Sequence, residues 1–109
     1  MYVIKNYLDP NDRDPFGQWF DEVEARAAAK VRRAIIKIEN GNLGNTHPVG
    51  FGREVREIVI DIGPGYRVYF AQDGNEVIIL LAGGTKQRQQ RDIDIAHERW
   101  ADYKRRKRG

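Results

Sequence analysis

The sequence predicts a single α+β domain, in which helices pack on an antiparallel sheet. A chain of 109 residues has room for one hydrophobic core. Apolar residues recur every three or four positions in the N-terminal third, a spacing typical of amphipathic helices. Three segments rich in β-branched and aromatic residues then follow one another with short turns between them, which indicates an antiparallel meander.

The N-terminal third is expected to form a strand followed by a helical segment. Residues 2–8 (YVIKNYL) are mostly β-branched or aromatic, as in a strand. Asp14 and Pro15 suit the N-cap and the first position of a helix. The helical pattern continues for about 26 residues, to Gly41, and this length favours a break near residues 24–29 into two antiparallel helices. Its apolar positions are Phe16, Phe20, Val23, Ala27, Val31, Ala34, Ile35 and Ile38.

The middle of the chain is expected to contain a loop and then the meander. Residues 40–52 are rich in Gly and Asn, as in a loop. Three strands are expected after it, over Val55–Ile62, Tyr66–Gln72 and Glu76–Ala82. Residues 63–65 (GPG) turn the chain between the first two, and Asp73-Gly74 is a strong hairpin signal between the last two. Residues 77–81 are all apolar, so this strand is expected to be covered on both faces.

A C-terminal helix is expected from Arg91 to about Lys107, with Ile93, Ala96 and Trp100 on one face. Residues 104–109 form a basic tail, for which a helix end and a disordered segment both remain open. The predicted element order is therefore β, α (one or two helices), β, β, β, α, within one domain that spans residues 1–109.

The composition excludes several classes of protein. Neither Cys nor Ser occurs, which excludes disulfides, thiolate metal sites and hydrolysis by a Ser-His-Asp triad. No apolar run reaches the ~18 residues of a membrane span, and the N-terminus lacks the apolar region of a secretory signal. A cytoplasmic protein without membrane contact is expected.

The charges are distributed unevenly around a formal net charge of +3. Residues 9–24 contain six acidic side chains and one basic side chain, whereas residues 86–109 contain nine basic and four acidic ones. A basic end favours a polyanionic partner such as nucleic acid. A tail that only keeps the protein in solution explains the same pattern equally well.

Polar side chains are expected to gather on one open face of the sheet. Because side chains alternate along a strand, Arg67, Tyr69 and Glu57 should project away from the helices. Lys86 and Arg88 follow the last strand at the rim of this face. Cations that bind phosphate, a carboxylate that accepts a proton and a phenol that stacks on a base suit phosphate chemistry. Alternatively, Arg67 and Glu57 form an ordinary cross-strand ion pair on a solvated face.

The two histidines do not indicate a metal site. His47 lies in the expected loop, where it is either a candidate catalytic residue or a surface residue without a role. His97 lies beside the apolar stripe of the C-terminal helix, where a structural role is expected. No HExxH-like spacing and no acidic cluster accompanies them, so neither a metal nor a cofactor is expected.

Several sequence blocks resemble a known family. They are residues 63–70 (GPGYRVYF), 80–86 (LLAGGTK), 89–93 (QQRDI) with Ala96, 16–20 (FGQWF) and 41–44 (GNLG). Together they resemble the HigB-like "addiction module killer" branch of the RelE/ParE toxin superfamily. The resemblance implies a RelE-like fold, namely a twisted antiparallel sheet with an N-terminal helical hairpin and a C-terminal helix. It also implies a type II toxin whose partner is a helix-turn-helix, HigA-like antitoxin encoded nearby, with operator DNA contacted only through the antitoxin complex.

The ribonuclease members of that superfamily cut mRNA on the ribosome without a metal, by attack of the ribose 2′-OH on the adjacent phosphate. By resemblance, Arg67 takes the phosphate-binding role and Lys86 binds phosphate or acts as the acid. Glu57 is the candidate base and Tyr69 the candidate for base stacking. Further candidates for RNA binding are Arg56, Arg88, Lys104, Arg105 and Arg106.

One departure and two alternatives remain open. Relatives often carry Arg two residues after the glutamate, where this chain has Val59, and the missing cation is expected to weaken catalysis. The main alternative is a ParE-like toxin that poisons DNA gyrase without catalysis. A third is an inactive domain that only regulates DNA binding by its antitoxin.

Overall fold

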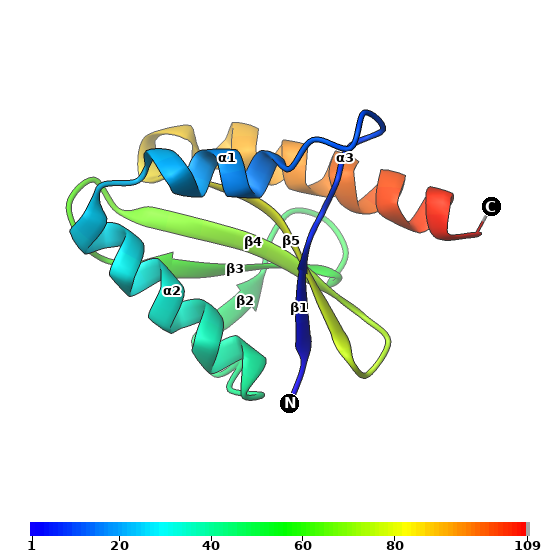
Figure 1. The fold of residues 1–109 in the computed structure, drawn as a ribbon, viewed down its shortest axis with the longest axis horizontal. Helices are drawn as coiled ribbons and strands as arrows, with labels where there is room; N and C mark the ends of the chain where they lie inside the picture. The colour runs from blue at the N-terminus through cyan, green and yellow to red at the C-terminus, as the bar shows by residue number, and fades with distance from the viewer. Residues whose placement is uncertain (109) are drawn as a thin grey trace.

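The computed structural model describes residues 1–108, which form one five-stranded sheet with helices on both faces (Figure 1). The elements are β1 (Val3–Asn6), α1 (Pro15–Glu22), α2 (Ala25–Glu39), β2 (Thr46–Pro48), β3 (Val55–Ile60), β4 (Tyr66–Asp73), β5 (Val77–Thr85), the 3₁₀ helix η1 (Lys86–Arg88) and α3 (Gln89–Arg108). None of the helices within residues 1–108 has the length and apolar composition that crossing a membrane requires. The combination of three α-helices with one sheet confirms the predicted α+β class.

The predicted helical break is present between α1 and α2. Asp14 caps α1, because its side chain accepts a hydrogen bond from the Gly17 amide at 2.9 Å, and Pro15 follows at the first helical position. The chain then leaves the helical conformation at Val23. Glu24 caps α2 by accepting from the Ala27 amide at 2.9 Å. Local capping chemistry therefore determines where the helical pattern is interrupted.

The sheet has the order β1-β5-β4-β3-β2 and is mixed, so the expectation of a fully antiparallel sheet was wrong. β3, β4 and β5 form the predicted antiparallel meander. β1 pairs with β5 in parallel, with Val3 opposite Val77. Parallel neighbours require a long connection, and the chain between β1 and β5 contains two helices and three other strands.

The expected loop at residues 40–52 contains an additional strand. β2 pairs with β3 antiparallel, and its three residues lie opposite Arg56–Ile58. The Val49 amide continues this pairing by donating to the Val55 carbonyl at 3.0 Å. Three residues are too few to show the alternation of a strand. The surrounding Gly and Asn residues therefore led to the prediction of a loop.

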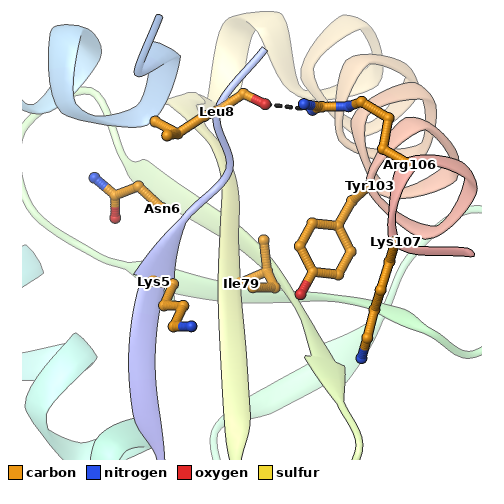
Figure 2. A pocket seen from close by; sticks show the side chains of 7 residues that line it. All are labelled: Lys5, Asn6, Leu8, Ile79, Tyr103, Arg106 and Lys107. Carbon is orange, nitrogen blue, oxygen red and sulfur yellow. Dashed lines mark hydrogen bonds between the residues drawn. The ribbon is translucent and has the colours of Figure 1, made fainter. Parts of the chain in front are cut away.

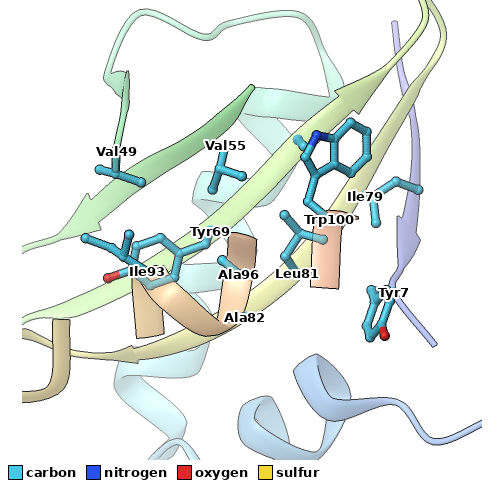
Figure 3. Close-up of a cluster of buried hydrophobic side chains, with 11 residues drawn as sticks. Tyr7, Val49, Val55, Tyr69, Ile79, Leu81, Ala82, Ile93, Ala96 and Trp100 are labelled. Atoms are coloured by element: carbon cyan, nitrogen blue, oxygen red, sulfur yellow. The ribbon is translucent and has the colours of Figure 1, made fainter. Parts of the chain in front are cut away.

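Two apolar layers enclose the sheet. Ile78 and Leu80 of β5 pack beneath α1 and α2, whereas Ile79 and Leu81 face α3. Figure 3 shows the second layer, where Trp100 of α3 lies over β5. As predicted, β5 is covered on both faces. The face that was expected to be open is thus covered by α3 over much of its length.

Candidate active site

A row of polar side chains crosses the sheet on the face that carries α3. His47 of β2 lies opposite Glu57 of β3, which lies opposite Tyr69 of β4. Arg67 lies two residues before Tyr69 and so shares its face, opposite Gly84 of β5. Strand register alone therefore brings one imidazole, one carboxylate, one guanidinium and one phenol together.

The Glu57 carboxylate is the centre of this row and is only 1% exposed. Its Oε2 accepts a hydrogen bond from Gln89 Nε2 at 2.9 Å, and its Oε1 lies 3.0 Å from His47 Nε2. Arg67 Nε lies 3.6 Å from Oε2. A buried carboxylate needs such partners, because burial without them carries a large desolvation cost.

His47 is the member of the row that reaches solvent, with 54% of its side chain exposed. The expectation that it lies in a loop was wrong, because β2 holds it in register with Glu57. With a proton on Nε2 shared with Glu57, the other ring nitrogen is free to accept a proton. A buried carboxylate that orients a half-exposed imidazole is an arrangement suited to proton transfer.

Arg67 and Lys86 lie near each other, as predicted from the meander. A β-carbon on Gly65 would be 3.7 Å from Arg67 Nη1 and 3.5 Å from Lys86 Cβ, so both side chains flank this glycine. The Lys86 amide also donates to the Gly65 carbonyl at 2.8 Å. Lys86 is exposed, whereas only 11% of the Arg67 side chain is. Within residues 1–108, Arg67 Nε and Nη1 have no hydrogen-bond acceptor.

Tyr69 does not lie on an open face, so the expected position of this residue was wrong. Its side chain is fully buried, next to Ile93 and Ala96 of α3 (Figure 3). Burial raises the pKa of its phenol, and the neighbouring Glu57 carboxylate raises it further. A buried ring offers no surface for a nucleobase, and Tyr69 instead belongs to the apolar cluster that packs against α3.

Two residues of α3 belong to the site although the sequence interpretation did not include them. Gln89 binds Glu57, as described above, and Asp92 is 6% exposed with no hydrogen bond to Oδ2. Burial raises the pKa of the Asp92 carboxyl. A β-carbon on Gly84 would overlap Asp92 Oδ2, so the glycine allows α3 to approach the strand. The strand was predicted to end at Ala82, whereas β5 continues through Gly84 to Thr85, so the sequence interpretation placed this glycine outside the strand.

The remaining RNA-binding candidates do not gather at one place. Arg56 alternates with Glu57 and so points to the opposite face, where its guanidinium donates to the side chain and the carbonyl of Thr46, both at 2.9 Å. Arg88 is exposed in η1 near the site. Lys104 lies fifteen residues beyond Gln89 in α3, which corresponds to about 22 Å along a helix.

The basic tail is helical through Arg108 and is held by acidic side chains. Lys104 binds Glu54 at 2.7 Å, and both Arg105 and Arg106 bind Asp102. Figure 2 shows the groove of about 390 Å³ beside this helix end, where Arg106 donates to the Leu8 carbonyl. Four of the five cations of the tail thus have acidic partners within the chain.

The side chains of the site are of the types that suit proton transfer and anion binding. Within residues 1–108, no group of three His, Cys, Asp or Glu side chains is arranged to hold a metal ion. The imidazole supplies an acid or base, and the lysine and arginine supply positive charge beside it. These are the elements that acid–base chemistry on a phosphodiester requires.

Comparison with known proteins gives two similarities. Residues 18–101 match the family described as "Phage derived protein Gp49-like (DUF891)". A protein of Haemophilus influenzae, described as uncharacterized, is 38% identical over 82 residues, which cover 74% of this chain and 81% of the relative. The matched segment of the family includes every residue of the row described above.

Proposed function

Because the chain belongs to the Gp49-like family of phage-derived proteins, we propose that it is the toxin of a toxin–antitoxin module. The family is related to addiction modules of the RelE/ParE type, which the sequence blocks described above also resemble. Membership implies an antitoxin partner. A helix-turn-helix, HigA-like protein is the antitoxin that we expect.

The proposed activity is cleavage of mRNA on the ribosome, without a metal. The ribose 2′-oxygen attacks the adjacent phosphorus while its proton leaves to a base. The bond from phosphorus to the 5′-oxygen breaks, and that oxygen takes a proton from an acid. The products are a 2′,3′-cyclic phosphate and a free 5′-OH. The observation that carries this proposal is the half-exposed His47 imidazole held by the buried Glu57 carboxylate.

The structure changes the roles that the sequence suggested for this reaction. Glu57 is too buried to contact RNA, so we assign proton transfer to His47 and treat Glu57 as its positioning residue. Lys86 is exposed and so contacts the scissile phosphate or protonates the leaving oxygen. Arg67 stabilises the growing negative charge from just beneath the surface. Val59, where relatives carry Arg, supplies no charge beside this row.

Expression without an antitoxin tests the proposal. We expect induced wild-type protein to arrest growth and to produce new mRNA 5′ ends that carry a hydroxyl group. Lys86→Ala should abolish both effects, whereas Arg53→Ala, which removes an exposed cation outside the site, should leave them unchanged. Growth arrest with intact transcripts and accumulated gyrase–DNA breaks would instead support the gyrase poison. Normal growth with folded protein would support the inactive domain.

A further inference from the structure

A basic surface lies between α2 and the outer edge of β3, at the end of the sheet that carries β2. Figure 1 shows the backbone of these elements. This α2–β3 groove has a volume of about 290 Å³. Lys30, Arg33 and Lys37 of α2 line one side, and residues 58–61 line the other. Val59, with 41% exposure, adds an apolar side chain at the edge. The groove is therefore basic on one wall and follows a strand on the other.

The three cations of the groove are not neutralised. Lys30, Arg33 and Lys37 are all exposed, and within residues 1–108 none of them has an acidic side chain at ion-pair distance. This differs from the C-terminal tail, where four of the five cations bind acidic partners. Asp61 is the single carboxylate among the described residues that line the groove. The uncompensated charge fits an acidic partner.

The wall formed by β3 becomes an open strand edge after Ile58. β2 pairs with β3 only as far as Ile58, so from Val59 onward no strand within residues 1–108 covers this edge. The bond from the Val49 amide to the Val55 carbonyl shows which residues of β3 direct their backbone groups to this side. Because such bonds alternate along an antiparallel pair, Val59 also directs its N–H and C=O outward. An unpaired edge of this kind can accept another strand.

We propose that the α2–β3 groove binds an extended, acidic segment of a protein partner, which adds a strand to the edge of β3. Lys30 and Lys37 are seven residues apart, about 10 Å along the helix. Side chains on one face of a strand are about 6.8 Å apart. Two or three carboxylates at alternating positions of the segment would therefore face the three cations. A phosphodiester chain would meet the Val59 carbonyl oxygen unfavourably, whereas a peptide pairs with both backbone groups.

The groove lies close to the candidate active site, so a segment bound there would affect access to that site. Val59 lies opposite Arg67 in the sheet, so a strand added at this edge would lie beside the candidate active site. If the proposed function holds, the antitoxin is the partner that supplies the segment. The existence of the binding surface does not depend on that function.

Binding of labelled peptides, measured by fluorescence anisotropy with the full chain, tests the proposal. The probe is a ten-residue peptide in which Glu alternates with Thr, and the same peptide with Lys in place of Glu is the comparison. We expect only the acidic peptide to bind, and we expect substitution of Lys30, Arg33 and Lys37 by Gln to weaken binding about tenfold. The control removes three other exposed cations, Lys5, Arg53 and Arg108, and should leave the affinity within about twofold.

A second variant tests strand addition separately from charge. Val59→Pro removes the outward N–H and should abolish peptide binding, whereas Val59→Thr retains the N–H and should not. Far-UV circular dichroism and thermal unfolding test whether both variants fold. If Val59→Pro does not fold, the charge variants alone test the proposal. Equal binding of the two peptides, or no binding, would overturn the proposal. The proposal would also be overturned if a ten-nucleotide oligouridylate bound more tightly than the acidic peptide, and if that binding required the three cations but was insensitive to Val59→Pro. None of these results depends on toxicity, so they separate this proposal from the proposed function.

Discussion

The pair formed by Glu57 and Arg67 should contribute measurable coupling energy to the stability of the fold. Arg67→Met leaves a carboxylate that is 1% exposed with only His47 and Gln89 as partners. Breaking a buried pair on one side costs about 3–5 kcal/mol. The 3.6 Å separation of Nε and Oε2 is longer than that of a direct hydrogen bond, so we expect the lower end of that range.

The complementary substitution, Glu57→Gln, retains the shape of the side chain and leaves the guanidinium without its counter-charge. We expect it to cost about 1–3 kcal/mol. The double variant should be more stable than the sum of the two losses predicts, by about 1–3 kcal/mol, because neither charge is then left alone. Domains of this size are stable by about 5–15 kcal/mol, so the single variants should remain folded.

Urea unfolding followed by far-UV circular dichroism measures this coupling. The pair formed by Lys104 and Glu54 is a suitable control, because its side chains are 37% and 61% exposed. The same cycle there should give less than about 1 kcal/mol. Additivity within about 0.5 kcal/mol at Glu57 and Arg67 would refute the claim that the two charges interact.

Three further predictions concern single substitutions, two of them beside the site and one at the end of α3. Gly84→Ala should destabilise the protein by about 1–3 kcal/mol, measured by urea unfolding, because its β-carbon would displace Asp92; an unchanged midpoint would contradict the close approach of α3. Tyr69→Phe should change stability by less than about 1 kcal/mol and leave growth arrest intact, because its buried hydroxyl has no hydrogen-bond partner; loss of activity in a folded variant would restore a direct role for the phenol. Asp73→Asn should have its full effect on stability above about pH 4 and a progressively smaller effect below it. Lys107 and Tyr103 hold the pKa of this carboxyl below its usual value, so the stabilisation is present above the unfolded pKa and is lost as the pH falls through the folded one. Thermal unfolding of both proteins from pH 2 to 7 should show the curves converging in acid, and a constant difference would exclude the interaction.

Local patterns predicted most of the fold. The capping residues Asp14 and Pro15, the helical break before Ala25 and the meander after Val55 are all present. Each of these features depends on neighbours in the sequence, which is why the chain itself reveals them. The parallel pairing of β1 with β5 depends on residues more than seventy positions apart, and no local pattern encodes it.

The part of the site that depends on local sequence patterns was also predicted. Strand alternation predicted that Arg67 and Glu57 share one face, with Lys86 at its rim, and the register of β3 with β4 and the position of Lys86 beside Gly65 agree with this. Strand alternation could not show that α3 covers this face. This covering buries Tyr69 and brings Gln89 into contact with Glu57. Packing between distant segments decides such burial.

Formation of 2′,3′-cyclic phosphate on mRNA is the most direct test of the central claim, which is that His47, held by Glu57, transfers the proton. Purified protein would be added to ribosomes programmed with a defined mRNA, and the cyclic-phosphate ends would be quantified over time. The wild-type protein should produce them, and His47→Asn should slow their formation by about 10²–10⁴-fold while its thermal unfolding stays close to that of the wild type. A folded His47→Asn variant that cleaves at the wild-type rate would contradict the claim.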